Sequence, residues 1–227
     1  MTDDLLAPLR ARFRQRCMAD LATLRQLLNQ DEDLRREPVR MVAHGLSGIA
    51  GSFGHSSLGA LASDIDDEIT KRQVVAEEKL RKLAAALEQA IGDAGARQDG
   101  EERRDGVQGY ALIIEDDLLM ADVLARHLEM LGYRPVSIVS TAADALAAIE
   151  GREPALILAD ICLADGESGL EIAQAIHRNH HVPLVFVSAR PELAAESPRT
   201  TVLDKSKLSL AALRTVIERA RRTWYLE

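Results

Sequence analysis

The stretch YALIIEDDLLMADVLARHLEMLG, residues 110–132, decides the fold of the second half of the chain. It opens with a short apolar run, passes through three consecutive acids and continues as an amphipathic pattern that stops at Gly132. A bounded apolar run is typical of a buried strand, and apolar residues at helical spacing predict a helix. A glycine just past the last periodic residue is a common helix stop. The stretch therefore predicts a strand, a turn that carries acids, and a helix.

The same alternation of strand and helix continues to the end of the chain. Further strands are predicted at residues 135–140, 154–160, 183–189 and 200–205, and further helices at 141–151, 169–180, about 191–197 and 208–222. The helical pattern at 191–197 is weak. Near-continuous apolar strands that alternate with helices are typical of a parallel sheet covered on both faces. We therefore expect an α/β domain over residues 109–227.

The first half of the chain has a purely helical pattern. Apolar residues recur at helical spacing in three groups: Phe13, Leu21, Leu24, Leu27 and Leu28; Leu58, Leu61, Ile65 and Ile69; and Ala84, Leu87 and Ile91. The charged stretch DEDLRREP, residues 31–38, is interpreted as a loop. About four helices in this length predict an all-α helical bundle over residues 1–93. The Gly-rich, charged stretch at 94–108 buries too little apolar surface to order itself and is interpreted as a linker.

Composition excludes several classes of protein. The 227 residues carry a formal net charge of -8, which argues against nucleic acid as the main partner, because phosphate contacts need clustered Lys and Arg. The two cysteines, Cys17 and Cys162, fall in different predicted domains, so a disulfide framework is not expected. The N-terminal stretch lacks the apolar core of a signal peptide, and no window reaches the roughly 18 apolar residues of a membrane span. We therefore expect a cytoplasmic protein without a membrane anchor.

Acidic, hydroxyl and amine side chains follow four of the five predicted strands. Residues 115–117, two aspartates after a glutamate, follow the first strand, Asp160 the third, Ser188 the fourth and Lys205 the fifth. The carboxyl ends of parallel strands meet at one edge of a sheet, where the reactive site lies. Carboxylates without His or Cys suit Mg²⁺, which would let one carboxylate attack a phosphoryl group. The lysine and the hydroxyl would then contact the phosphoryl oxygens.

These motifs resemble those of a receiver domain of bacterial two-component response regulators. LIIEDD is similar to the acidic-pair motif, LILADICLADGESGLE to the phosphoacceptor motif, VFVSA to the Ser/Thr motif and LDK to the lysine motif. The resemblance implies a flavodoxin-like (βα)5 fold with a parallel sheet in the order 2-1-3-4-5. It also implies these roles: Asp160 as phosphoacceptor; Glu115 and Asp116 as Mg²⁺ ligands with Asp160 and the Cys162 carbonyl; and Ser188 and Lys205 as the hydroxyl and the lysine that assist phosphorylation and dephosphorylation.

The sequence departs from the receiver pattern in three ways. Leu163-Ala164 replaces the usual Met-Pro after the phosphoacceptor, and the loop with DGESG is one residue longer than the common one. Ser206 stands where a proline often follows the lysine, and Val202 where an aromatic residue usually reports the conformation. We expect Asp160 to be phosphorylated as in other receivers, and the way in which phosphorylation is transmitted to differ.

A second candidate site surrounds His44 in the stretch VRMVAHGLSGIAGSFG, residues 39–54. At about 100° per residue, the apolar residues Val42, Leu46, Ile49 and Phe53 lie opposite His44 on a helix. Gly48 and Gly51 lie beside it, so we expect a histidine that faces water on a surface cleared of side chains. Two alternatives remain open for the glycines: a close helix–helix contact and a loop. A metal site is disfavoured, because His55 alone is near.

The stretch resembles the signature of histidine phosphotransfer (Hpt) domains, which are helical bundles with one exposed phosphorylatable histidine. The resemblance covers roughly residues 5–90 and implies that His44 accepts a phosphoryl group. Ser47 stands where the family usually has a lysine, and Arg40, one turn before the histidine, is a candidate substitute.

Together the two resemblances predict a phosphorelay protein that accepts and passes phosphoryl groups through His44 and Asp160. No GK[ST] motif follows the glycines, so we expect no kinase activity, and we find no DNA-binding module. The expected partners are a histidine kinase, another receiver or response regulator, or a second copy in a homodimer. The alternative, which Ser47 favours, is a phosphorylation-switched binding adaptor whose helical bundle docks a partner and is not itself phosphorylated.

Overall fold

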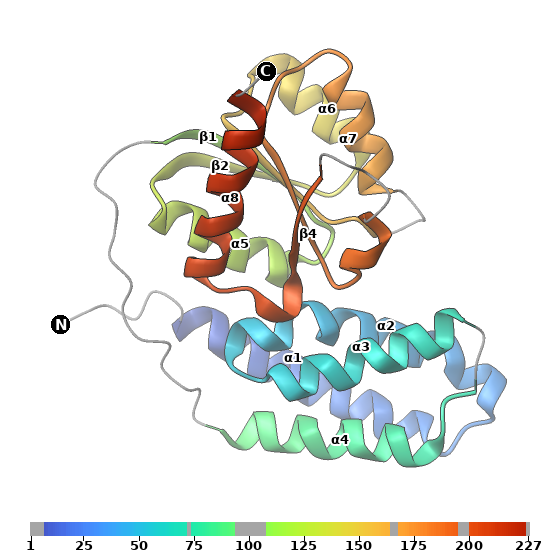
Figure 1. Ribbon diagram of the computed structural model, residues 1–227. Coiled ribbons are helices and arrows are strands. Elements are labelled where there is room, and N and C mark those ends of the chain that lie inside the picture. The colour runs from blue at the N-terminus through green and yellow to red at the C-terminus, as the bar shows by residue number, and fades with distance from the viewer. Residues whose placement is uncertain (1–6, 72–73, 94–107, 164–167, 195–199, 226–227) are drawn as a thin grey trace. The chain divides into compact units, whose positions relative to one another are not determined.

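The computed structural model describes residues 7–71, 74–93, 108–163, 168–194 and 200–225. The chain divides into two compact units, Met1–Asp99 and Gly100–Glu227, which are described separately below (Figure 1). The predicted linker at 94–108 lies, except for its last residue, outside the described residues. Within the described parts, no helix is both long enough and apolar enough to cross a membrane.

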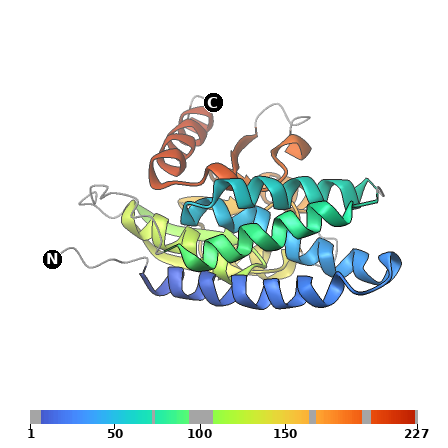
Figure 2. The ribbon, with the colours of Figure 1, turned by 90° about the horizontal axis from the view of Figure 1, so that it is seen from below.

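The N-terminal unit is the predicted helical bundle (Figure 2). It consists of α1 (Ala7–Leu27), α2 (Glu32–Ile49), a short 3-10 turn η1 (Ala50–Phe53), α3 (Ser56–Thr70) and α4 (Glu77–Gly92). α2 packs along α3, and α1 packs along α4. The buried core takes one apolar stripe from each helix, including Leu24, Leu46, Ile65 and Leu83. The Phe13 and Phe53 rings stack with centroids 4.5 Å apart, which attaches η1 to α1.

The interpretation of residues 31–38 as a loop is wrong, because α2 already begins at Glu32 and runs through Pro38. A proline in a helix interior removes a hydrogen bond and costs roughly 3 kcal/mol or more. Packing against α3 offsets that cost: Arg36 Nη2 donates to the Ile69 carbonyl at 2.9 Å, and Val39 is buried. The charged residues indicated a loop, but tertiary contacts decide the helix start.

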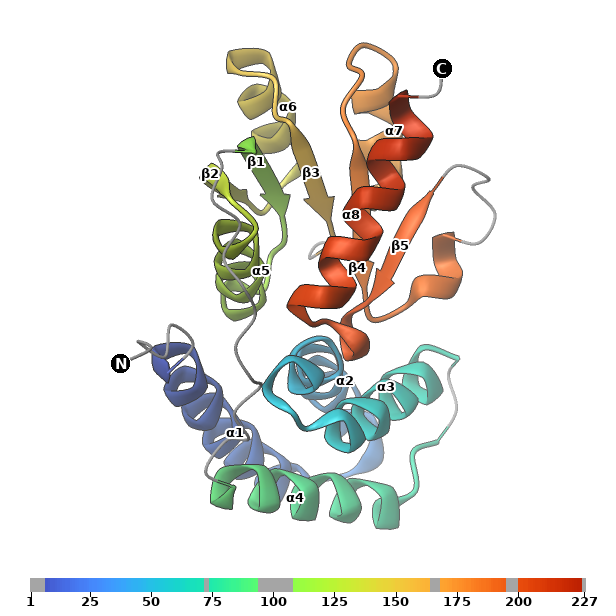
Figure 3. The same cartoon turned by 60° about the vertical axis from the view of Figure 1, so that its left-hand side comes forward.

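The C-terminal unit is a five-stranded parallel sheet with helices on both faces (Figure 3). Its elements are β1 (Gly109–Ile114), α5 (Leu118–Met130), β2 (Tyr133–Val139), α6 (Ala142–Gly151), β3 (Leu156–Ala159), α7 (Gly169–His177), β4 (Leu184–Ser188), η3 (Pro191–Ala194), β5 (Thr201–Asp204), η4 (Lys205–Lys207) and α8 (Leu210–Tyr225). The strand order β2-β1-β3-β4-β5 confirms the predicted flavodoxin-like topology.

The two faces of the sheet are both buried, as the apolar strands predicted. One core is built under α6 and α7 from alternate strand residues such as Leu112, Ile114 and Ile157, together with Ile149 and Ile176. α5 packs on β1 and β2, and α8 on β4 and β5. The weak helix predicted at about 191–197 begins as a single 3-10 turn, η3, and residues 195–199 lie outside the described residues.

Candidate functional site

Three carboxylates converge at the carboxyl edge of the parallel sheet. Glu115 and Asp116 follow β1, and Asp160 follows the neighbouring strand β3, where its N–H donates to the Ile114 carbonyl at 2.9 Å. One oxygen from each of the three side chains lies within 4.8 Å of the other two. Glu115 and Asp160 are buried, while Asp116 is partly exposed. This all-oxygen donor set fits a hard cation such as Mg²⁺.

Lys205 supplies the positive charge of this pocket. Its Nζ lies 2.7 Å from Asp160 Oδ2 and 2.7 Å from Glu115 Oε2, and its side chain is 5% exposed. The contact with Asp160 is a hydrogen bond as well as an ion pair. Burial alone would lower the pKa of Lys205, but the two carboxylates outweigh it and raise that pKa. The lysine therefore stays charged beside these two carboxyl groups.

The charges of the pocket do not balance without a further cation. Burial, against the opposing effect of Lys205 and together with the charge of Asp160, raises the pKa of the Glu115 carboxyl to about 8. A raised carboxyl pKa means that the ionised form is disfavoured in this environment. A divalent cation among the three carboxylates would relieve this repulsion, so the residues present fit Mg²⁺.

The third acid of the run has a structural role. Asp117 is the N-cap of α5, and its Oδ1 accepts hydrogen bonds from the N–H groups of Leu119 and Met120 at 2.9 and 3.1 Å. An N-cap carboxylate satisfies N–H groups that have no partner inside the helix. The run EDD therefore divides into two residues that face the pocket and one that starts the helix.

Ser188 and Cys162 lie at the same edge of the sheet. Ser188 ends β4, is buried, and pairs in register with Asp204 of β5; its Oγ accepts from the Arg190 N–H at 3.2 Å. The Cys162 N–H donates to Asp160 Oδ1 at 3.3 Å. Residues 164–167, which contain most of the predicted longer loop, lie outside the described residues. Roles for Ser188 and the Cys162 carbonyl remain predictions.

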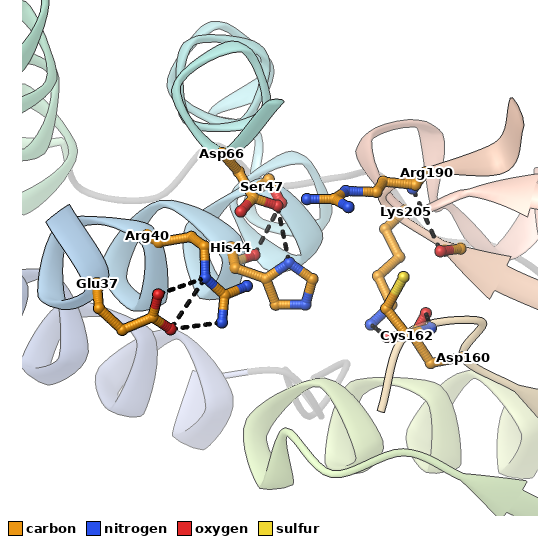
Figure 4. A network of polar contacts seen from close by, with 10 residues as sticks. Glu37, Arg40, His44, Ser47, Asp66, Asp160, Cys162, Arg190 and Lys205 are labelled. Carbon is orange, nitrogen blue, oxygen red and sulfur yellow. Dashed lines mark hydrogen bonds and ion pairs between the residues drawn. The ribbon is translucent and has the colours of Figure 1, made fainter. Parts of the chain in front are cut away.

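His44 lies on α2 and is held by a buried acid of α3 (Figure 4). Its Nδ1 lies 2.9 Å from Asp66 Oδ2; the Asp66 side chain is 2% exposed and the His44 side chain 33% exposed. An ionised carboxylate only accepts hydrogen bonds, so this contact places an imidazole proton on Nδ1 and, in the neutral ring, leaves the lone pair on Nε2. The histidine is thus half-buried rather than fully facing water, with its tautomer fixed.

The environment of His44 contains one basic side chain of its own helix. Arg40 lies beside the imidazole in Figure 4 and forms a bidentate ion pair with Glu37, with Nη2 2.6 Å and Nε 3.0 Å from Oε1. The hydrogen bonds from Arg40 lower the pKa of Glu37. Ser47 is buried and its Oγ donates to the His44 carbonyl at 2.7 Å, so this side chain bonds back to its own helix.

The expected glycine-cleared surface is wrong. Gly48 and Gly51 are both buried, and the Gly51 segment packs against α3. A Cβ at Gly59 of α3 would lie 3.6 Å from the Gly51 nitrogen and 3.6 Å from the Ser47 carbonyl oxygen. The α3 backbone therefore packs directly on the segment that contains Ser47 and Gly51, which favours the contact between helices, the alternative left open. That packing also brings α3, with Asp66, to His44.

Asp66 is the functional candidate that the sequence patterns did not single out. It lies among the apolar residues Leu58, Ala62, Ile65 and Ile69, which form the buried stripe of α3. A carboxylate within an apolar stripe rarely lies buried unless it is paired. That position was the available signal, but the identity of its partner depends on the packing of α3 on α2.

Family models match both units of the chain. The model of the Hpt domain matches residues 8–93, and that of the response regulator receiver domain matches residues 111–199. The chain joins an Hpt domain to a receiver domain. This pair of domains fits two-component signal transduction and indicates a signalling protein rather than a kinase.

Relatives share one or both parts. The phyllosphere-induced regulator PhyR of Methylorubrum extorquens is 31% identical over 186 residues, 81% of this chain and 61% of PhyR. The transcriptional regulatory protein YvrH of Bacillus subtilis is 30% identical over 79 residues, 35% of this chain and 33% of YvrH. The solution NMR structure of the receiver domain of Erythrobacter litoralis PhyR is 30% identical, with a TM-score of 0.44, and covers 50% of this chain and 89% of that domain. The chain therefore spans about three fifths of the length of PhyR.

Proposed function

We propose that this protein is a phosphorelay component in which Asp160 of the receiver and His44 of the Hpt domain accept and pass phosphoryl groups. The observation that carries the proposal is the buried pocket of Asp160, Glu115 and Lys205, where one ammonium lies 2.7 Å from two carboxylates. The donors and acceptors outside the chain would be a histidine kinase or another response regulator.

Asp160 is the nucleophile of the receiver step. A carboxylate oxygen of Asp160 bonds to the phosphorus of a phosphohistidine donor, the P–N bond breaks, and the electron pair returns to the donor imidazole. Mg²⁺, when held by Glu115, Asp116 and Asp160 with the Cys162 carbonyl, would neutralise charge on the phosphoryl group. The Lys205 ammonium, already 2.7 Å from Asp160, then contacts a phosphoryl oxygen, and Ser188 donates a hydrogen bond to another.

His44 is the acceptor of the Hpt step. The hydrogen bond from Nδ1 to Asp66 leaves Nε2 as the nucleophile toward a phosphoaspartate, whose P–O bond breaks and whose electron pair stays on the carboxylate. Asp66 also stabilises the positive charge that the imidazole gains during attack. Arg40 would supply the cation that the family lysine provides, by leaving Glu37, since exposed ion pairs contribute at most about 1 kcal/mol.

The adaptor alternative has one supporting observation. Ser47 is buried against its own helix, so the side chain at the family lysine position does not reach a phosphoryl group on His44. In that alternative Asp160 is phosphorylated, and the helical bundle binds a partner without accepting the group.

The relay and the adaptor differ in whether the protein forms a phosphohistidine at His44. The full chain is incubated with acetyl phosphate and Mg²⁺, and the acid-labile phosphohistidine is separated from the hydroxylamine-sensitive acyl phosphate. We expect both in the wild type, the acyl phosphate alone in His44→Ala, and neither in Asp160→Ala. His181→Ala, which removes an exposed histidine outside both sites, is the control and should resemble the wild type. Acyl phosphate without any His44-dependent label would support the adaptor and overturn the relay.

A further inference from the structure

The lysine of the acidic pocket follows a strand end whose backbone is fixed by two polar side chains. β5 ends at Asp204, and Lys205 opens the 3-10 turn η4. Asp204 Oδ1 accepts a hydrogen bond from the Ser206 N–H at 2.8 Å and another from the Ser206 hydroxyl at 2.6 Å. A carboxylate that accepts the N–H two residues later holds the backbone between them in one turn conformation. The residue between them is Lys205.

The two ends of this turn are anchored independently. Asp204 pairs with Ser188 in the β4–β5 ladder, and the Leu208 N–H donates to the Lys205 carbonyl at 3.2 Å. Leu208 is itself buried. The hydrogen bonds between Asp204 and Ser206 therefore determine the path of the backbone between β5 and the buried Leu208. The Lys205 side chain is buried and its Nζ pairs with two carboxyl groups, so a change in the backbone at Lys205 alters whether its ammonium reaches them.

We propose that Asp204 and Ser206 are positioning residues for Lys205, which hold its ammonium at Asp160 and Glu115. The inference rests on the proposed function, in which that ammonium contacts the phosphoryl group. Position 206 is where receivers often have a proline after the lysine, and here the Lys205–Ser206 peptide bond is trans. The two hydrogen bonds that Asp204 accepts from Ser206 constrain the backbone on either side of Lys205.

A purely electrostatic role for Asp204 has little support. Its other contact is with Lys207, whose Nζ lies 3.6 Å from Asp204 Oδ2 and whose side chain is 78% exposed. Exposed ion pairs of this kind contribute little. The hydrogen bonds and the charge can be separated by substitution, because Asn keeps a side-chain oxygen acceptor while losing the charge.

The test measures the initial rate of phosphoryl incorporation at Asp160 from acetyl phosphate with Mg²⁺. Asp204→Ala should slow it about tenfold, since small displacements of a contacting group have effects of this size or larger. Asp204→Asn should stay within about twofold of the wild type, because it rescues the turn. Asp144→Ala is the matched control: it removes a carboxylate that accepts the Thr141 hydroxyl at 2.8 Å on α6, and it should change nothing.

A double-mutant cycle separates positioning from general destabilisation. Lys205→Met should slow the incorporation strongly by itself, and adding Asp204→Ala to it should slow it no further, because the positioning residue acts through the lysine. Beryllofluoride affinity gives a second readout of the same cycle. If Asp204→Ala does not fold, Ser206→Ala carries the test: it keeps the N–H donor but loses the hydroxyl donor, so it should slow the rate of the otherwise wild-type protein and not that of Lys205→Met, and an unchanged rate in the otherwise wild-type protein would overturn the inference.

Three further results would overturn the inference: wild-type rates in Asp204→Ala, equal slowing by Asp204→Ala and Asp204→Asn, or further slowing in the Lys205→Met background. A Lys205→Met variant with the wild-type rate would instead refute the proposed role of the lysine, and the inference would fall with it. The two failures are therefore distinguishable.

Discussion

Replacing Asp66 tests whether this carboxylate fixes the tautomer of His44. In the structure His44 Nδ1 lies 2.9 Å from Asp66 Oδ2, and Asp66 is the buried partner. A hydrogen bond to a charged group contributes about 1.5–3 kcal/mol, which corresponds to roughly 10- to 150-fold in an equilibrium constant. His44 is a third exposed, so we expect the lower half of that range. Asp66→Ala should therefore reduce the preference for the Nδ1–H tautomer by about tenfold.

The assay is a long-range ¹H–¹⁵N correlation spectrum of the imidazole above its titration range, where the two nitrogens report which one carries the proton. Asp66→Asn should retain the Nδ1–H tautomer more weakly, because the amide oxygen still accepts. Asp67→Asn is the matched control on the next residue of α3, where the carboxylate makes a 3.4 Å contact with Lys71. Unchanged tautomer populations in Asp66→Ala would refute the argument that this acid fixes the nucleophilic nitrogen.

The remaining predictions concern the pocket and the cysteines. Lys205→Met leaves two buried carboxylates without their cation, so it should lower the free energy of unfolding by about 3 kcal/mol in chemical denaturation. Mg²⁺ should restore part of this loss, and a loss that Mg²⁺ does not affect would contradict the assigned ligands. Gly169→Ala should destabilise the protein, because a Cβ there would collide with the Asp160 carbonyl oxygen, whereas Gly151→Ala, with open space around it, should not; equal melting temperatures would argue against this packing. Burial raises the pKa of the Cys17 thiol to about 12, so at pH 8 it should stay protonated and unreactive toward Ellman's reagent until the protein unfolds; fast labelling in the native state would show the opposite.

The sequence carried enough information to predict the receiver fold and the location of its pocket. Apolar strands of a parallel sheet are buried on both faces, so they stand out in the sequence, and residues that follow them must meet at one edge. The structure brings Glu115, Asp116, Asp160 and Lys205 together there, as the strand order requires. The order of the strands, and of the polar residues that follow them in the sequence, was sufficient for this prediction.

The helical unit was less predictable because its details depend on contacts between helices. Charged residues and Pro38 suggested a loop, and only the packing of α2 on α3 explains why the helix starts earlier. The glycines after His44 have the same local pattern whether they face water or another backbone. Asp66 could be recognised as an acid on an apolar stripe, but its partner lies 22 residues away in sequence.

Phosphorus NMR of the full chain distinguishes a relay through His44 and Asp160 from phosphorylation of Asp160 alone. After incubation with acetyl phosphate and Mg²⁺, we expect two protein-bound resonances, one of an acyl phosphate on Asp160 and one of a phosphohistidine on His44. The second should be missing in His44→Ala, and both should be missing in Asp160→Ala. A single acyl phosphate resonance in the wild type, unchanged by His44→Ala, would contradict the relay.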